Sequence, residues 1–192
     1  MHPFRHFRTI TRHRHRVIAH CFRAGIGWQG LFHDLSKYTL TEFIPGARYY
    51  LGNRSPNEGE REAKGYSLAW MHHKGRNRHH FEYWVDVDPV KKCYAPVRMP
   101  TRFVAEMFCD RVAASKIYQG KAYTDAHPLS YFMRGKDKRS IHPETSDLLE
   151  EWLTMLAEEG EDATFRHIRS VLRAEKKKKR IKEKTDAENF TK

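Results

Sequence analysis

Residues 101–118 carry the clearest helical pattern in the chain, and this pattern limits the fold more than any other feature. The apolar residues that define it are Phe103, Val104, Met107, Phe108, Val112 and Ala113. Thr101 stands where a helix cap is expected, and Gly120 stands where the helix would end. Strand patterns are almost absent, apart from a short extended piece that we expect near residues 85–97. The sequence therefore predicts an all-α architecture.

Glycines and prolines divide the rest of the chain into further helices. We expect these over residues 11–24, 28–38, 39–52, 60–75, 142–160 and about 162–184, with a short helix or turn at 124–135. The helix at 28–38 is expected to turn four apolar side chains inward, those of Trp28, Leu31, Phe32 and Leu35. Residues 86–100 contain three prolines without a clear period, so an irregular connection is expected there.

The net charge of +12 is confined to the two ends of the chain. Residues 1–23 contain six arginines and no acid, and residues 173–184 contain eight basic residues against two acidic ones. We expect one domain over residues 1–172 and a basic tail over residues 173–192, since 192 residues suit a single core. Such a tail is usually a solvated helix end or a disordered extension, and less often a contact for nucleic acid.

The compartment follows from what the chain lacks. No apolar run approaches the length of a membrane span, and the N-terminal residues have no apolar core of the signal-peptide kind, so we expect a cytoplasmic protein. Cys21, Cys93 and Cys109 form no close pair and are odd in number, which disfavours both a disulfide framework and a zinc ribbon. We expect reduced cysteines, with Cys21 and Cys109 in the core.

Histidines gather at a few places along the chain. Most of the 13 fall into small groups, at His13, His15 and His20, at His33, at His72 and His73, and at His79 and His80. Each group lies on a different predicted helix, and the helix at 101–118 adds Asp110. Side chains of this kind, projected from several helices into a bundle core, form metal sites. Their nitrogen and oxygen atoms suit one or two divalent ions, such as Mn, Fe, Zn or Mg.

Asp34 and Lys37 stand beside His33 in the string "HDLSK". A carboxylate that uses both oxygens can bridge two ions, and Asp34 is the candidate for that role. Lys37 follows His33 by one helical turn, so its ammonium could meet a phosphate held by the ions. Each signal also has an ordinary explanation, such as an exposed lysine or a hydrogen-bonded structural histidine.

The histidine pairs leave alternatives open, because adjacent residues of a helix point about 100° apart. We favour His72 over His73 and His79 over His80, since a spacing of seven residues returns both to one face if the helix is continuous. The ordinary explanation for residues 72–80 is a basic surface loop.

The order of these residues resembles the HD-domain superfamily, helical metal-dependent phosphohydrolases. "HRHRV" (residues 13–17) looks like the first-helix motif of that family, and "HDLSK" (33–37) is similar to the HDIGK form of its HD-GYP branch. "HHKGRNRHH" (72–80) is similar to its middle histidines and "AEMFCDRVAA" (105–114) to its last helix. The longer combined string resembles a small uncharacterised family of bacterial and phage proteins within or near this superfamily.

The resemblance implies an HD-domain-like helical bundle and a set of site residues. The implied metal ligands are His13, His33, Asp34, His72, His79 and Asp110, with Asp34 also catalytic and His15 as an alternative to His13. Lys37 would act in catalysis and bind the substrate phosphate, together with Arg48 or Arg76. The implied reaction is hydrolysis of a phosphomonoester or phosphodiester, with a nucleotide as the first candidate, by metal-bound hydroxide.

Two further functions are compatible with the same residues. A histidine-rich ligand set also resembles the HD-type di-iron oxygenases, which would carry out oxidation on the same scaffold. Alternatively, the arginines of residues 5–16 and the lysine tract could bind the backbone of a nucleic acid, with a structural metal at the histidines.

Overall fold

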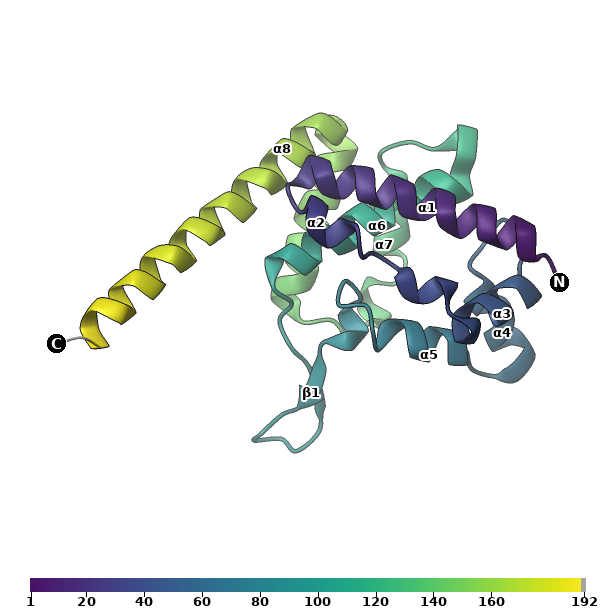
Figure 1. The fold of residues 1–192 in the computed structure, drawn as a ribbon, viewed down its shortest axis with the longest axis horizontal. Helices are drawn as coiled ribbons and strands as arrows, with labels where there is room; N and C mark the ends of the chain where they lie inside the picture. The colour runs from purple at the N-terminus through teal and green to yellow at the C-terminus, as the bar shows by residue number, and fades with distance from the viewer. Residues whose placement is uncertain (191–192) are drawn as a thin grey trace.

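The computed structural model has helix α6 at its centre (Figure 1). It describes the backbone of residues 1–190 and the side chains of residues 1–186. In chain order the elements are α1 (Pro3–Ala24), α2 (Gly27–Gly30), η1 (Leu35–Tyr38), α3 (Leu40–Arg48), α4 (Pro56–Lys64), α5 (Leu68–Lys74), η2 (Phe81–Tyr83), β1 (Val85–Val87), β2 (Tyr94–Pro96), α6 (Thr101–Gln119), η3 (Gly120–Ala122), α7 (His127–Met133), η4 (Lys136–Lys138) and α8 (Pro143–Phe190). The fold is all-α apart from one small hairpin, as the sequence predicts.

Helix α6 is buried on almost every side over its first thirteen residues. Val104, Phe108 and Val112 have no exposed surface and form the middle of the hydrophobic core. Helices α1 and α8 pack against α6 and add further core side chains, among them Val17 and Trp152. Each large apolar side chain buried in this way contributes about 1.5–3 kcal/mol to folding. This packing fixes α6, and with it the acidic side chains that α6 carries.

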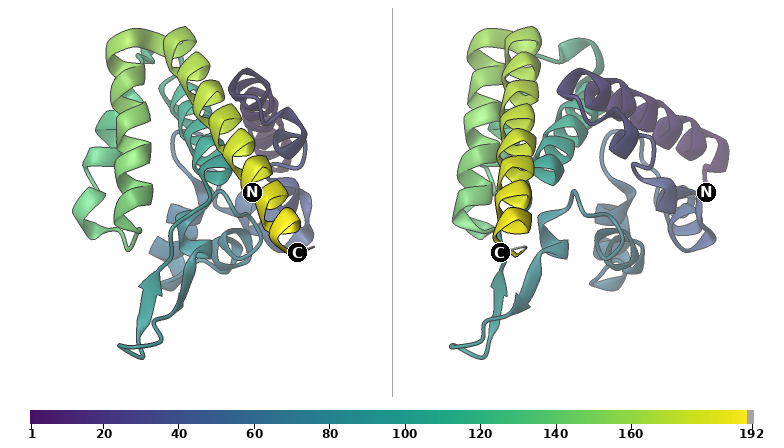
Figure 2. Two further views of the ribbon diagram at one scale, coloured as in Figure 1. Left: turned by 90° about the vertical axis from the view of Figure 1, so that its left-hand side faces the viewer. Right: turned by 60° about the vertical axis from the view of Figure 1, so that its left-hand side comes forward.

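The hairpin occupies the segment where an extended piece was expected. Strand β1 pairs antiparallel with β2, and Val85 lies opposite Pro96. The hairpin projects from the helical body (Figure 2). It takes no part in the core, since its first strand is exposed along its whole length.

Helix α1 is longer than its apolar pattern predicts. It starts at Pro3, and the stripe that it buries runs through His6, Ile10, His13, Val17 and His20. Three of these five residues are histidines, so apolar residues alone mark only the second half of the helix. The inner face of α1 is therefore partly polar, and it carries histidines as well as residues that pack in the core.

The expectation of one amphipathic helix over residues 28–38 is wrong. Helix α2 ends at Gly30, and Trp28 and Phe32 are 83% and 70% exposed. Gly30 lies so close to α1 that an added Cβ would be 2.4 Å from the Cβ of Cys21. The close packing of α2 against α1 therefore requires a glycine at position 30. The chain turns after this residue, and the turn directs His33 and Asp34 inward in place of the apolar side chains.

The segment 60–75, expected to be one helix, is two. Gly65 ends α4 with a φ of 81°, and Ser67 then caps α5 by accepting a hydrogen bond from the Trp70 amide. The buried carboxylate of Glu60 accepts hydrogen bonds from the Ser67 hydroxyl and the Ala69 amide. These bonds fix the start of α5, which carries His72 and His73.

Helix α8 is a pair of helical segments joined at Gly160, where the sequence predicts that one helix ends and another begins. Gly160 has a φ of 78°, a conformation that favours glycine. The two segments run in opposite directions against each other (Figure 2), and His167 Nε2 lies 3.4 Å from Glu151 Oε1.

The basic tail continues α8 without a break at residue 173. Residues 173–186 are exposed, and this end of α8 projects beyond the other helices (Figure 1). The solvated helix end that the charge pattern suggested is thus seen over these residues. Residues 191–192 of the predicted tail lie outside the described part of the chain.

The cysteines lie where the sequence places them. Cys21 and Cys109 are buried, Cys93 is exposed, and none forms a disulfide. Among the described residues, no helix combines the length and the apolar character that a membrane span requires.

His20 makes folding sensitive to acid. Its ring is 5% exposed, packs 5.4 Å from the Phe165 ring and has Nδ1 3.3 Å from the Cys109 carbonyl oxygen. Burial lowers the pKa of His20 to about 4, against 6.5 for an exposed histidine, with Lys116 and Arg23 acting in the same direction and Glu161 against them. The unfolded chain therefore binds this proton more readily than the folded protein between about pH 6.5 and pH 4.

We predict that this group weakens folding as the pH falls below 6.5 and has no effect above it. At pH 5 the loss from His20 should be about 2 kcal/mol of unfolding free energy. Urea unfolding at pH 7.5 and pH 5, compared between the wild-type protein and His20→Asn, measures it. The variant should lose about 2 kcal/mol less between the two values of pH, and an equal loss in both proteins would contradict the prediction.

Candidate metal centre

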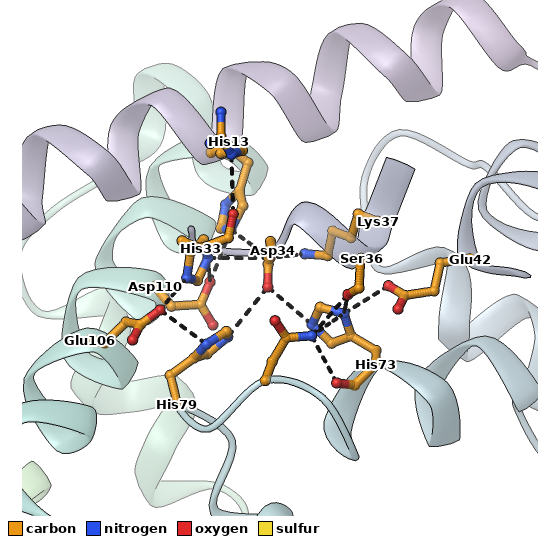
Figure 3. A network of polar contacts seen from close by, with 12 residues as sticks. His13, His33, Asp34, Ser36, Lys37, Glu42, His73, His79, Glu106 and Asp110 are labelled. Carbon is orange, nitrogen blue, oxygen red and sulfur yellow. Dashed lines mark hydrogen bonds and ion pairs between the residues drawn. The ribbon is translucent and has the colours of Figure 1, made fainter. Parts of the chain in front are cut away.

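Histidines and carboxylates from α1, α5, α6 and two loops meet at one point inside the bundle (Figure 3). The candidate donors are His13, His33, Asp34, His73, His79, His80, Glu106 and Asp110. His33 and Asp34 lie on the turn between α2 and η1, and the loop after α5 carries His79 and His80. Asp34 lies at the centre of the set and is only 1% exposed.

The turn that presents Asp34 has an uncommon backbone conformation. Asp34 has a φ of 54° and a ψ of 26°, in the left-handed region that aspartate adopts more readily than most other residues. Arg14 of α1 fixes the turn, since its guanidinium donates to the carbonyl oxygens of His33 at 3.1 Å and Leu31 at 2.5 Å. Arg14, the first of the two arginines in "HRHRV", thus holds the turn that carries the "HD" pair.

The two carboxylate oxygens of Asp34 face different histidines. Oδ2 lies 3.2 Å from His33 Nε2 and 3.8 Å from His13 Nε2. Oδ1 lies 3.2 Å from His73 Nε2 and 3.4 Å from His79 Nε2. Asp34 therefore stands between two separate groups of donors.

Each group is compact enough to surround one ion. The first consists of His13, His33, Asp34 and Asp110, and the second of Asp34, His73, His79 and His80. Within each group the donor atoms lie within 4.8 Å of one another. Asp34 belongs to both, which is the arrangement of a carboxylate that bridges two ions.

Several buried atoms at this point have no hydrogen-bond partner of acceptable geometry among the described residues. They are both oxygens of Asp34 and the Nε2 atoms of His13, His33, His79 and His80. Buried polar atoms are nearly always hydrogen-bonded. Here the nearest polar contacts are between ionisable groups, such as Lys37 Nζ at 2.6 Å from Asp34 Oδ2 and Asp110 Oδ1 at 2.9 Å from His13 Nε2. One ion bound within each group would be coordinated by these atoms, and their chemistry fits a divalent metal.

Two buried glutamates orient the histidine rings. Glu106 Oε1 accepts from Nδ1 of His33 at 2.9 Å and lies 3.2 Å from Nδ1 of His79. Glu42 Oε2 accepts from Nδ1 of His73 at 2.7 Å. With a proton on Nδ1, each ring keeps the lone pair of Nε2 directed at Asp34, as in other metal sites.

The sequence contains a signal for only one of these glutamates. Glu106 precedes Asp110 by four residues on α6, so the two side chains share a helical face, and that spacing was available from the sequence. The spacing of Glu42 from the histidines along the sequence matches no helical or motif pattern, so the sequence gives no signal for it.

The preference for His72 over His73 is wrong. His73 faces Asp34, whereas His72 Nδ1 contacts the other oxygen of Glu42 at 2.7 Å. The spacing argument fails because α5 ends at Lys74, so that His79 belongs to a loop and shares no helical face with His72. His79 does lie in the centre, and His80 joins it there.

Of the remaining predicted residues, some lie in the centre and others are exposed on the surface. His13 lies in the centre, while its alternative, His15, is exposed on the outer face of α1. Arg48 and Arg76 are also exposed and do not line the cavity described below, so the structure does not support a role for either in binding substrate. Arg48 is the last residue of α3, and Arg76 follows the end of α5 by two residues.

The carboxylates of the centre are ionised. Burial opposes ionisation of Asp34, but His33 and Lys37 outweigh it and hold the pKa of this carboxyl well below its usual range. Burial also opposes ionisation of Glu106, and hydrogen bonds from His33 and His79 lower its pKa to about 2. Burial disfavours the charged His33 ring too, yet the adjoining carboxylates raise its pKa. Asp110 is held ionised in the same way. The ionised carboxylates also raise the pKa of His73, whereas burial lowers the pKa of His13 and His80. Metal binding would release the protons that His33 and His73 hold.

A cavity of about 710 Å³ opens beside the centre. His13, His73, His80 and Asp110 line it on one side, so the candidate metal donors are within reach of a bound molecule. Lys37 also lines this cavity, and its Nζ lies 2.6 Å from Asp34 Oδ2. The volume suits a small organic molecule.

Comparison with models of known protein families shows which family the chain belongs to. A family model described as "Family of unknown function (DUF5662)" matches residues 2–155. The chain belongs to this family. The DUF5662 match includes every candidate donor of the metal centre and excludes the basic end of α8. No matching curated protein and no matching solved structure was found for the chain.

Metal binding can be tested with matched histidine variants of this DUF5662 protein. Protein incubated with Mn²⁺ or Zn²⁺ and then desalted should retain up to two ions per chain, measured by elemental analysis. We predict that Asp34→Asn removes most of the bound metal and that His73→Ala weakens binding about tenfold to a hundredfold, because each removes a candidate ligand.

His72→Ala and His15→Ala serve as controls, since each removes a neighbouring imidazole that points away from Asp34. Both should bind metal nearly as well as the wild-type protein. A larger effect of His72→Ala than of His73→Ala would contradict the arrangement described above.

Proposed function

We propose that the protein is a metal-dependent phosphohydrolase of the HD-domain type, acting on a phosphomonoester or phosphodiester of a small molecule such as a nucleotide. The observation that carries this proposal is the position of Asp34. Its two oxygens face two groups of histidines, and a lysine lies beside it on the wall of a cavity.

The order of the donors along the chain supports the HD-domain assignment. A histidine of the first helix, the "HD" pair, histidines from residues 72–80 and a distal aspartate all meet at one point. This is the order in which the resemblance to the superfamily places its ligands. The all-α fold agrees with it.

We assign the ligands by group. His13, His33, Asp34 and Asp110 would hold one divalent ion, and His73, His79 and His80 would hold a second together with Asp34. When bound, such ions supply Lewis acidity, which lowers the pKa of water and neutralises charge on a phosphoryl group. The protein supplies the remainder, namely a fixed carboxylate between the two groups and imidazoles held in one orientation by Glu106 and Glu42.

Lys37 is the residue that would position the phosphate. Burial disfavours its charge, but Asp34 and Asp110 raise the pKa of its ammonium, so Lys37 is a cation at neutral pH. Lys37 borders the cavity, and the four-carbon stem of a lysine has several rotatable bonds. Lys37 can therefore pair with a phosphoryl oxygen of a molecule bound beside Asp34.

Activity measurements on the metal-loaded protein test the proposal. We predict hydrolysis of at least one member of a panel containing p-nitrophenyl phosphate, bis-p-nitrophenyl phosphate and common nucleotides. Asp34→Asn should lower kcat/KM about a thousandfold, because both groups of donors lose their shared carboxylate. Lys37→Gln should lower it about tenfold to a hundredfold while leaving the metal content unchanged.

Lys91→Gln, an exposed lysine of the hairpin, is the matched control and should retain full activity. Metal-loaded protein that cleaves nothing in the panel would count against hydrolysis. Iron near two ions per chain in protein as isolated, together with oxygen uptake on a candidate substrate, would instead favour a di-iron oxygenase on the same donors.

A further inference from the structure

The wall of the cavity next to the metal centre carries three guanidinium groups without a carboxylate partner among the described residues, those of Arg111, Arg134 and Arg139, and two of them lie over one aromatic ring. Arg111 follows Asp110 on α6, and Arg139 follows η4; both line the cavity. Among the described residues, neither forms an ion pair within 4.0 Å. We refer to Arg111 and Arg139 as the arginine pair.

Both members of the arginine pair lie over one aromatic ring. The Cζ atoms of Arg111 and Arg139 are 5.6 Å and 5.4 Å from the centroid of the Phe132 ring, which is itself fully buried. Like charges repel, so two guanidinium groups beside one ring disfavour each other unless an anion joins them. Glu82 lines the same cavity but makes no ion pair with either arginine in the described structure.

The two arginines differ in how far the protein itself uses them. Arg139 donates to the carbonyl oxygens of Phe132 at 2.6 Å and Tyr131 at 3.4 Å, so it also stabilises the end of α7. The Nε of Arg111 is buried and has no hydrogen-bond partner among the described residues. A guanidinium has five N–H donors, so both side chains keep donors for a ligand.

We propose that the arginine pair binds a second anionic group of the substrate, so that the substrate class is a compact small molecule with one phosphate to be cleaved and a further phosphate or a carboxylate. This inference rests on the proposed function, since it takes the phosphate to be cleaved as bound beside Asp34 and Lys37. Guanidinium groups bind carboxylates and phosphates through paired hydrogen bonds, which gives them geometric selectivity for such groups.

The geometry limits the size of this substrate. Asp110 of the metal centre and Arg111 are consecutive residues of α6, and their side chains leave the helix about 100° apart. The two anionic groups therefore bind next to each other in one cavity, on adjoining walls. A short carbon skeleton between them satisfies this arrangement.

The test uses three probes with the same three-carbon skeleton, glycerol 3-phosphate, 3-phosphoglycerate and 2,3-bisphosphoglycerate. The first has one anionic group, the second adds a carboxylate and the third adds a carboxylate and a second phosphate. Calorimetric titration of the Mn²⁺-loaded protein should show that 3-phosphoglycerate, 2,3-bisphosphoglycerate or both bind at least about tenfold more tightly than glycerol 3-phosphate. Tight binding of 3-phosphoglycerate identifies a carboxylate, and a further gain with 2,3-bisphosphoglycerate identifies a phosphate.

The variants Arg111→Gln and Arg139→Gln should each remove most of this advantage while leaving the affinity for glycerol 3-phosphate unchanged. Arg48→Gln, an exposed arginine outside the cavity, is the matched control and should keep the advantage. Arg111→Lys and thermal melts of all variants show that a loss of binding does not come from unfolding.

The outcomes separate this inference from the proposed function. Equal affinities for the three probes in the wild-type protein, or an advantage that survives in both folded arginine variants, would overturn the inference even if hydrolysis is observed. An advantage that depends on the arginine pair in a protein that hydrolyses no phosphate ester would establish the anion site and leave the hydrolase proposal refuted.

Discussion

The structure depends on a single buried carboxylate. Asp34 has almost no exposed surface, and an isolated ionised carboxylate in such a place would be very costly. The fold compensates with Lys37 and with imidazoles that reach Asp34 from α1, α5 and the loop after α5. Helix α6 adds Glu106, which contacts the Nδ1 atoms of His33 and His79 and so orients both rings. Helices far apart in the sequence are thus tied to one another through the same charged group.

The same cavity joins two regions of opposite charge. Asp110 and the candidate metal donors behind it form one wall, and Arg111 and Arg139 present guanidinium donors on the adjoining wall. A molecule with two anionic groups would contact both, one through bound cations and one directly. The rigid core around α6 keeps the two regions at a fixed separation, because Asp110 and Arg111 are neighbours on that helix.

Prediction from the sequence was most successful where packing alone determines structure. The helical period of residues 101–118 indicates α6 closely, since this helix is surrounded by core. It failed where polar residues take core positions. Histidines on the inner stripe of α1 hide its first half, and the turn at His33 and Asp34 replaces a helix that the apolar residues of 28–38 suggest. Both failures fall at the candidate site, where local pattern and function conflict.

The sequence by itself determined the all-α class, the order of histidine, "HD" pair, histidines and distal aspartate, and the separation of the basic tail from these residues. These properties depend only on composition and on spacing along the chain. Only the tertiary structure decided that His73 and not His72 faces Asp34, that Glu42 and Glu106 orient the rings, and that Arg111 rather than Arg48 or Arg76 borders the cavity. The physical reason is that the direction of a side chain depends on where a helix ends and what it packs against, and both are set by contacts between residues distant in the chain.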